Sequence, residues 1–469
     1  MTSPAAARFS ASPFRARVAV IGGGLTGLTA AWELQRAGLA PVVFESAPRV
    51  GGAICAHREG EWLHELGPNS LLEGSAEVAT FIDALGLGSR RLYAAPSAKK
   101  RYIVRGAAPV AMPDSPLSFV TTKLFSFGAK LGLVGEPWRA RGPADGSESV
   151  ADFVERRLGR EFLDYAINPF VGGVYAGDPR LLSVREAFPK LHALEQEHGS
   201  LLRGAWAKRN ASGGPKGRIF SFAGGLEELP QTIARDLGPA VRLKAVVRAI
   251  RRRGTVWEVE SEGAGALGAI ETFSSVVVAM PGDAIAALPF ENVPGATQLG
   301  GLREIAHPPV ASVFTGYRRE DVAHALDGFG MLVPEVERRQ ILGTLFSSTL
   351  FPGRAPEGHV AITTFVGGMR SPELGRRDDA GLLAVVQSEL AHLLGVRAAP
   401  VYTHVRRWPR AIPQYTVGYE RYKALYAQIE ATAPGLFFGG NSRDGISLAN
   451  CIASGRRLAL AAAAHGPAA

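Results

Sequence analysis

The hydrophobic pattern is clearest near the start of the chain. Residues 17–21 and 40–45 are short apolar runs, and residues 25–38 between them place apolar side chains at helical spacing. Short apolar runs are typical of strands buried inside a parallel sheet, and the helical spacing indicates a crossover helix between them. The pattern therefore predicts a β-α-β unit as the first ordered part of the protein.

Downstream segments alternate between strand-like and helix-like patterns. The expected elements are a glycine turn and amphipathic helix over 222–238, a small sheet over 240–261, a buried strand over 274–281, and strands over 292–408 with a helix near 378–395. Residues 434–464 repeat the order strand, glycine turn and helix. We therefore expect a mixed α/β protein whose first sheet is completed only at the C-terminal end.

Residues 115–138 differ in composition from the rest of the chain. They are rich in Phe, Leu and Val and carry only three charged residues, Lys123, Lys130 and Glu136. Two interpretations stay open: a helical subdomain with its own core, or a segment on a membrane interface with its lysines at the headgroups. Under the second interpretation, a charge at Phe119 or Phe125 would weaken membrane binding.

The next segments are more polar. Residues 146–165 are predicted to form a capped helix with Glu148 and Asp152 in its first turn, where the helix dipole favours carboxylates. Residues 203–218 are basic and contain glycines, which indicates a loop between structural units.

Composition limits the number of domains and the class of partner. A chain of 469 residues is longer than one hydrophobic core usually serves. The net charge of +9 suits anionic partners. The arginines come as scattered pairs, however, and no nucleic-acid module is recognisable, so we expect no nucleic-acid partner.

Cysteine usage and hydropathy exclude further classes. Cys55 and Cys451 are the only cysteines, so neither a disulfide framework nor a metal site is expected. No apolar run approaches the ~20 residues of a membrane-spanning helix. Residues 1–17 lack the apolar centre of a secretory signal, and a disordered tail is favoured over a remnant of an organelle-targeting segment.

Candidate chemistry begins with the glycines between the first strand and helix. Gly22, Gly24 and Gly27 form a GxGxxG pattern, and Glu45 closes the second strand. In such a unit the first glycine permits a tight turn, the second lets the backbone approach a pyrophosphate, and the third allows close packing of helix on strand. The Glu45 carboxylate can accept hydrogen bonds from a ribose diol. The unit therefore predicts a dinucleotide site.

A second motif narrows the choice of nucleotide. Arg49, Gly51 and Gly52 follow the ribose carboxylate, and residues 65–70 (ELGPNS) are expected to return the chain to the same site. A nicotinamide dehydrogenase has no particular need of this motif. A flavoprotein that buries its cofactor lengthwise does, because a second backbone segment must approach the pyrophosphate and flavin. We therefore expect a flavin.

Motifs along nearly the whole chain carry a resemblance to one family. They are GPNS (67–70), AKKRYIVRG (98–106), NPFVGGVYAGDPRLLSVREAFPKL (168–191), FAGGLEELP (222–230), GFGMLVP (328–334), GTLFSSTLFPGRAP (343–356), TTFVGG (363–368), RWPRAIPQY (407–415) and GGNSRDGISLANCIASGRR (439–457). With the glycine motifs, they resemble the monoamine-oxidase-type FAD superfamily and, within it, the oxygen-dependent protoporphyrinogen oxidases.

The resemblance implies an architecture. It has a Rossmann-like FAD domain of the monoamine-oxidase/p-hydroxybenzoate-hydroxylase type, interleaved with a mixed-sheet substrate domain and a helical, membrane-associated domain. The implied bounds are 18–92, 218–291 and 409–469 for the FAD domain, 93–106 and 292–408 for the substrate domain, and 107–217 for the helical domain.

The resemblance also implies a reaction. Non-covalent FAD removes six electrons from protoporphyrinogen IX in three two-electron steps, and O2 reoxidises the flavin to give H2O2. No catalytic dyad or metal-ligand spacing is found in the sequence, which agrees with chemistry that needs position and a dry pocket. Implied partners are the cytoplasmic face of a membrane, a second copy of the chain and a ferrochelatase-type enzyme.

The motif matches assign roles to individual residues. For the substrate, Arg101 corresponds to an arginine that grips a propionate, Gly173 to a glycine at the pocket wall and Asn69 to an asparagine near flavin and substrate. The apolar positions that sandwich the tetrapyrrole are Phe329, Leu332, Leu345 and Phe365. Added to the glycine motifs, the implied flavin contacts are Thr26, Ser46, Ala53, Gly67, Pro68, Asn69, Ser70, Val247, Ile446, Ser447 and Leu448. Cys451 and Cys55 are expected only to contribute to helix packing.

Three rival functions stay open. Oxidation of coproporphyrinogen III to coproporphyrin would need a more basic pocket, because that substrate has two more carboxylates. An amine oxidase would need an aromatic cage near the flavin. A non-catalytic carrier of the type of the Rab GDP-dissociation inhibitors keeps this fold without catalysis, but it would be expected to lose part of the flavin motif, which is complete here.

Overall fold

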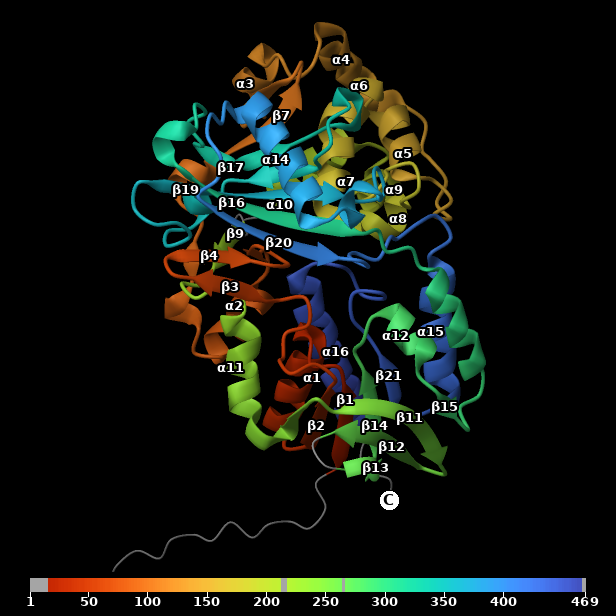
Figure 1. The fold of residues 1–469 in the computed structure, drawn as a ribbon. Helices are drawn as coiled ribbons and strands as arrows, with labels where there is room; N and C mark the ends of the chain where they lie inside the picture. The colour runs from red at the N-terminus through yellow and green to blue at the C-terminus, as the bar shows by residue number, and fades with distance from the viewer. Residues whose placement is uncertain (1–15, 212–216, 264–265, 466–469) are drawn as a thin grey trace, which may run out of the picture.

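The computed structural model describes residues 16–211, 217–263 and 266–465, so the predicted N-terminal tail lies outside the described residues up to residue 15. In Figure 1 a parallel sheet with its helices occupies the lower half of the view, and a larger mixed sheet lies above it. The helices between residues 116 and 211 cluster at the top, beside the larger sheet. The mixed α/β architecture predicted from the sequence is confirmed.

The lower sheet has five strands, all parallel, in the order β10-β2-β1-β14-β21. They are β1 (Arg17–Ile21), β2 (Ala40–Glu45), β10 (Val241–Leu243), β14 (Ser275–Val278) and β21 (Leu436–Phe438). Helices α1 (Leu25–Arg36) and α16 (Leu448–His465) pack together on one face, in one core with Val18, Val20 and Val277. Because β21 is an edge strand of this sheet, the sheet is completed only near the C-terminus, as predicted.

The other face of the parallel sheet is covered by a four-stranded sheet in the order β13-β12-β11-β15. Its strands are β11 (Val246–Arg253), β12 (Val256–Gly263), β13 (Ala266–Phe273) and β15 (Phe290–Glu291). Phe273 meets Phe44 of β2 edge to face, with ring centroids 6.0 Å apart. The small sheet predicted over 240–261 is confirmed, except that its first strand, β10, pairs with β2 instead.

The upper sheet has seven strands in the order β20-β16-β19-β18-β17-β7-β8. They are β7 (Lys100–Arg105), β8 (Ala108–Ala111), β16 (Val310–Arg318), β17 (Gly328–Leu332), β18 (Gly343–Leu345), β19 (His359–Gly367) and β20 (Tyr402–Trp408). Helix α14 (Asp379–Leu394) covers one face through a core that contains Val313, Ile362 and Leu390. The opposite face lies above the hairpin of β3 (Ala56–Glu59) and β4 (Trp62–Glu65) (Figure 1).

The segment between β8 and β9 (Arg218–Ser221) is helical throughout much of its length. It comprises α3 (Pro116–Thr121), α4 (Phe127–Gly132), the 3-10 turn η3 (Leu133–Trp138), α5 (Val150–Arg157), α6 (Arg160–Phe162), α7 (Asn168–Tyr175), α8 (Val184–Ala187), α9 (Pro189–His198) and α10 (Leu201–Ala211). Fully buried Arg157 ties these helices together through ion pairs with Glu136 and Glu195. The segment is therefore a unit with its own polar cross-links.

Two local predictions in this segment are wrong. Helix α10 runs to residue 211, where a loop over 203–218 was expected; residues 212–216 lie outside the described part. The start of the helix is fixed by the buried Glu136 carboxylate, which accepts from the Leu201 and Leu202 N–H groups at 2.9 and 3.3 Å. Glu148 precedes the Ser149 N-cap of α5, so only Asp152 lies in the first turn.

The remaining elements connect these layers. They are β5 (Leu71–Glu73), β6 (Leu92–Tyr93), α2 (Ala76–Ala84), α11 (Glu228–Leu237), α12 (Gly282–Ala287), α13 (Ser347–Leu350) and α15 (Glu420–Thr432). Strands β5, β9 and β6 form a separate antiparallel sheet.

Candidate active site

A cavity of about 890 Å³ opens at the carboxyl end of β1 and β2 and extends to the end of β20. The carboxyl end of a parallel sheet is where open α/β sheets bind their ligands. The predicted cofactor residues that line this cavity are Gly22, Gly24, Thr26, Glu45, Ser46, Gly51, Gly52, Ala53, Pro68, Val247, Ile446 and Leu448. Segments far apart in the sequence thus meet around one space.

The three glycines of the first motif have different surroundings. Gly22 has φ +107°, and a Cβ there would lie 2.6 Å from the Ala279 carbonyl oxygen. A Cβ at Gly27 would lie 2.0 Å from the Gly22 carbonyl oxygen, so only glycine lets α1 approach the loop after β1. A Cβ at Gly24 would meet nothing within 4 Å, which leaves its backbone open to the cavity.

Glu45 is held at the cavity edge by backbone groups. The Gly23 and Ala47 N–H groups each donate to its carboxylate at 2.7 Å. These bonds fix the carboxylate beside the glycine loop, in a position to accept further hydrogen bonds from a ribose. The open backbone of Gly24, the fixed carboxylate and the length of the cavity fit a dinucleotide flavin.

Arg49 acts on the loop and not on the cavity. Its guanidinium donates to the carbonyl oxygens of Val50, Ile54 and Gly52 at 3.1, 3.1 and 2.8 Å. The Gly51 N–H donates to the Gly23 carbonyl at 2.8 Å and joins this loop to the first one. Arg49 therefore folds residues 50–54 against the glycine loop, and it does not line the cavity.

Four other predicted cofactor residues do not line the cavity, namely Gly67, Asn69, Ser70 and Ser447. The Asn69 side-chain amide donates to the Gly67 carbonyl at 3.0 Å, and Ser447 accepts from the Asn450 N–H at 3.1 Å near the start of α16. Gly67 is required for close packing, because a Cβ there would lie 2.1 Å from the Ala53 carbonyl oxygen.

The expectation of helix packing is confirmed for Cys451, which packs against the core shared by α1 and α16, but not for Cys55. Cys451 lines the cavity, and burial raises the pKa of its thiol to about 11. The thiol therefore stays neutral near pH 7 and is a poor nucleophile. Cys55 is buried in the loop before β3 and belongs to no helix.

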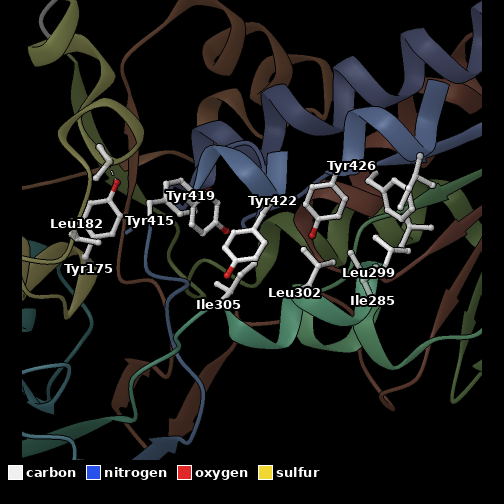
Figure 2. Packing of buried hydrophobic residues seen from close by; sticks show 14 of the residues in the cluster. Tyr175, Leu182, Ile285, Leu299, Leu302, Ile305, Tyr415, Tyr419, Tyr422 and Tyr426 are labelled. Atoms are coloured by element: carbon white, nitrogen blue, oxygen red, sulfur yellow. Dashed lines mark hydrogen bonds between the residues drawn. The ribbon is translucent and has the colours of Figure 1, made fainter. Parts of the chain in front are cut away.

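The far wall of the cavity includes Gly440, Asn441 and Ile446 of a loop over 439–446. Tyrosines that lie in a row in Figure 2 support this loop. The Tyr415 hydroxyl donates to the Asn441 carbonyl and accepts from the Gly445 N–H at 2.9 Å. The Tyr419 hydroxyl donates to the Ser442 carbonyl at 2.7 Å. Burial raises the pKa of Tyr426 to about 12, and that of Tyr415 is raised further for the same main reason. These hydroxyls stay protonated and define the loop.

Sequence reasoning missed this tyrosine row, although a signal was present. Tyrosines at 415, 419, 422 and 426 recur at the spacing of a buried helical side, although α15 itself begins only at Glu420. Trp408 was missed as well: its indole N–H donates to the Leu66 carbonyl at 2.7 Å, and its ring lines the cavity. Of the RWPRAIPQY motif, three residues line the cavity, namely Trp408, Arg410 and Ala411.

The predicted substrate residues share the sheet face that looks away from α14. Strand pairing places Leu332 opposite Gly343 and Gly343 opposite Phe365. One step along, Arg101 pairs with Gly330, and Gly330 with Leu345. Cross-strand partners point to the same side of a sheet, so the side chains of Arg101, Leu332, Leu345 and Phe365 lie on one face. We call this surface the inner face of the upper sheet.

Phe329 and Gly173 join the same group by other means. The pairing of β17 with β7 shifts register between Gly328 and Gly330, and this bulge presents Phe329 under the Arg101 guanidinium, 5.5 Å from the ring centroid. Gly173 on α7 faces Leu332, since a Cβ there would lie 2.4 Å from Leu332 Cδ2. The structure thus brings all six predicted substrate residues outside the FAD motif into one region.

A buried ion pair lies below the inner face. Arg354 and Glu65 are both buried, with 3.4 Å between Nη2 and Oε1, and Arg354 also donates to Ser221 Oγ at 2.9 Å. Burial outweighs the attraction of Arg354 and raises the pKa of Glu65 to about 7. Among the described residues, no group of His, Cys, Asp and Glu could hold a metal ion.

Comparisons with known proteins identify the family of this chain. The model of the family described as flavin containing amine oxidoreductase matches residues 25–462. Protoporphyrinogen oxidase 2, chloroplastic/mitochondrial, of Arabidopsis thaliana is 34% identical over 94% of this chain and 93% of its own length. Coproporphyrinogen III oxidase of Staphylococcus aureus is 28% identical over 94% of this chain and 97% of its own length.

Solved structures show the same fold. A crystal structure of a protein from Exiguobacterium sp. superposes with a TM-score of 0.76 at 24% identity, over 95% of this chain and 98% of that one. Putrescine oxidase bound to putrescine superposes with a TM-score of 0.69 at 17% identity, over 96% and 99%. With a family match over residues 25–462 and a relative at 34% identity over nearly its whole length, the chain belongs to the flavin-containing amine oxidoreductases.

Proposed function

We propose that this protein is a porphyrinogen oxidase and that its substrate is protoporphyrinogen IX, which it converts to protoporphyrin IX. Each of three rounds removes two electrons and two protons from the substrate, and O2 takes them up as H2O2. The observation that carries the proposal is the inner face of the upper sheet: Leu332, Leu345 and Phe365 lie together on it, with Arg101 at one margin.

Bound flavin would supply the two-electron acceptor. The chain supplies the rest: Glu45 and the backbone around Gly24 hold the dinucleotide, and the tyrosine-supported loop over 439–446 closes its far end. The inner face excludes water from a large apolar ring, and Arg101 fixes one edge of that ring through a carboxylate. Gly173 leaves room for the ring next to Leu332.

Coproporphyrinogen III is the second candidate. The relative named for protoporphyrinogen is 34% identical to this chain, and the one named for coproporphyrinogen is 28% identical. These identities are too similar to decide between the two substrates. Arg101 has no ion pair among the described residues, and its guanidinium lies over the Phe329 ring, so this margin offers a free arginine to a substrate whose carboxylates lie on one side. An amine oxidase is disfavoured, because the two relatives described above are both named as porphyrinogen oxidases.

The test offers the flavin-loaded protein protoporphyrinogen IX and coproporphyrinogen III side by side in air and follows porphyrin fluorescence and H2O2. A higher kcat/KM for protoporphyrinogen IX supports the proposal. A higher value for coproporphyrinogen III transfers the same chemistry to that substrate. If neither is oxidised while flavin is bound, the proposal is wrong, and a carrier on this fold is favoured.

We further propose that the helical segment rests on a membrane at the cytoplasmic face. Its outer side exposes Leu117, Phe127 and Trp138 at 76%, 80% and 76%, an apolar surface that a soluble monomer rarely leaves open. Lys123 and Lys130 lie among them, as in interfacial segments. No helix in the described part is long and apolar enough to cross a membrane.

The membrane proposal needs different residues from those expected. Phe125, one of the two positions expected to insert, is 5% exposed and stacks on Phe162 with ring centroids 4.3 Å apart. Phe119 is half-buried in the same cluster. Both interpretations of residues 115–138 therefore stay open, since one side of the segment packs in a core and the other side is exposed. We also propose that the protein forms a homodimer and delivers its porphyrin product to a ferrochelatase-type enzyme.

A further inference from the structure

Arg406 and Arg407 are neighbours on β20 with opposite surroundings. Strand alternation turns them to opposite faces of the upper sheet. Arg407 looks outward and pairs with Asp379 at the start of α14. Arg406 looks inward, opposite Ser312 of β16, which in turn lies opposite Phe365 of β19.

Arg406 therefore belongs to the inner face. A continuous cross-strand row runs from β7 to β20 through Ile103, Leu332, Gly343, Phe365, Ser312 and Arg406. Arg101 is two residues before Ile103 and on the same side. The two arginines thus mark opposite margins of the surface on which the predicted tetrapyrrole contacts lie. Five strand spacings separate their strands, about 24 Å along the sheet.

Arg406 has no anionic partner among the residues that the structure describes. Its Nε is buried without a hydrogen-bond partner, and its guanidinium carbon lies 4.5 Å from the ring centroid of Trp408, which lines the cofactor cavity. Its charge adds to the lowering of the pKa of His404, for which burial is the main cause. An arginine that is partly desolvated and unpaired favours an incoming carboxylate, which it can bind through two N–H groups.

We propose that Arg406 is a specificity-determining residue that binds a second substrate carboxylate at the margin opposite Arg101. The inference rests on the proposed function. Protoporphyrinogen IX carries its two propionates on adjacent rings, so only one margin meets a carboxylate. Coproporphyrinogen III carries a propionate on every ring, so both margins do. Arg406 therefore lets the protein accept coproporphyrinogen III as an additional substrate.

The test compares two variants that each remove one positive charge from the same strand. Arg406→Gln is expected to lower kcat/KM for coproporphyrinogen III about tenfold, mainly through KM, with less than a twofold change for protoporphyrinogen IX. Arg407→Gln, the matched control, is expected to change neither. Arg406→Lys keeps the charge and is expected to restore part of the loss. Flavin content, measured for each variant, shows that the fold is intact.

Binding gives a readout independent of turnover. The dissociation constant of coproporphyrin III, measured by quenching of protein fluorescence, is expected to rise about tenfold in Arg406→Gln. The dissociation constant of protoporphyrin IX is expected to stay unchanged. Equal losses for both ligands would overturn the inference and assign Arg406 to the flavin or the fold. An unchanged ratio, or no binding of coproporphyrin III by the unaltered protein, would also overturn it. Failure of the proposed function differs, since then the unaltered protein oxidises neither porphyrinogen.

Discussion

Gly173 of α7 and Leu332 of β17 are in contact so close that a Cβ on residue 173 would lie 2.4 Å from Leu332 Cδ2. The contact joins the helical segment to the inner face of the upper sheet. A methyl group at this point must displace the leucine toward the space assigned to the substrate. The neighbouring glycine, Gly172, has room: its Cβ would lie 3.9 Å from Leu342 Cδ2.

This contact predicts a difference between two alanine variants. Gly173→Ala is expected to raise KM for protoporphyrinogen IX severalfold and to leave flavin content unchanged, because only the substrate side is altered. Gly172→Ala is the control and should behave as the unaltered protein. Steady-state kinetics of both variants check this, and equal KM values would remove Gly173 from the substrate site.

Arg101 predicts a loss of substrate affinity without loss of cofactor. A charge-assisted hydrogen bond to a carboxylate is worth about 1.5–3 kcal/mol, and exposure places Arg101 at the low end. Arg101→Ala is therefore expected to raise KM about tenfold, while Lys99→Ala, an exposed neighbour, should have little effect. An unchanged KM in Arg101→Ala would contradict the propionate assignment.

Replacement of Glu45 is expected to affect binding of the flavin. Its carboxylate accepts from the Gly23 and Ala47 N–H groups at the cavity edge, so Glu45→Ala loses both the loop contacts and the proposed ribose contact. The flavin-to-protein absorbance ratio of the purified variant is expected to fall well below that of the unaltered protein. Glu33→Ala, on the same unit but paired with Arg456 outside the cavity, is the control. Full flavin occupancy in Glu45→Ala would rule out the ribose role.

His64 predicts a pH dependence of stability. It is buried between Phe314, His57 and His404, and burial lowers its pKa from 6.5 to about 3. Between these values the unfolded chain binds a proton that the folded protein does not, so stability rises with pH across this window and is lost on acidification. From pH 7 to 5 this loss amounts to about 2 kcal/mol.

The variant His64→Phe removes this loss, because phenylalanine can keep the ring contacts and does not titrate. The measurement is the free energy of unfolding in urea of the flavin-loaded protein at pH 7 and pH 5. The difference between the two pH values should shrink in His64→Phe and stay the same in His392→Phe, where the histidine is exposed on α14. Equal shrinkage in both would contradict the assignment.

The exposed apolar residues predict membrane binding. Leu117→Glu combined with Phe127→Glu is expected to move the protein from the vesicle pellet to the supernatant in sedimentation with anionic lipid vesicles. Leu460→Glu on α16 changes a residue of similar exposure, 73%, on the other part of the molecule and should leave binding unchanged. If the double variant still pellets, the apolar surface serves another contact.

Much of the cofactor unit could be predicted from the sequence because its signals are local. The apolar runs of β1 and β2, the glycines between them and the acid at the end of β2 lie within about thirty residues. Gly27 is required by its contact with the nearby Gly22 carbonyl, and Gly22 has a φ of +107°, although the carbonyl closest to its Cβ position belongs to Ala279, far along the chain. The order strand, turn and helix near the C-terminus was sufficient to expect that β21 completes the sheet.

The direction in which each side chain points could not be predicted from such local signals. Arg406 and Arg407 are the same residue type at adjacent positions, and only the pairing of β20 with β16 decides which one enters the inner face. Phe125 and Phe127 differ likewise, the first buried and the second exposed, because packing on Phe162 fixes the orientation of their segment.

The sequence by itself thus determined the family, the mixed α/β class and the glycine-rich cofactor loop, since each depends on residues close together along the chain. Tertiary structure alone decided that Tyr415 supports the loop over 439–446, that Arg49 folds a loop and leaves the cavity wall to others, and that α10 is a helix. Distant partners set the first and the last of these outcomes: Asn441 accepts from Tyr415, and Glu136 accepts from the first N–H groups of α10. The Arg49 contacts are local, but their geometry depends on how the loop over 50–54 is folded, so burial and hydrogen bonding decide all three only once the chain has folded.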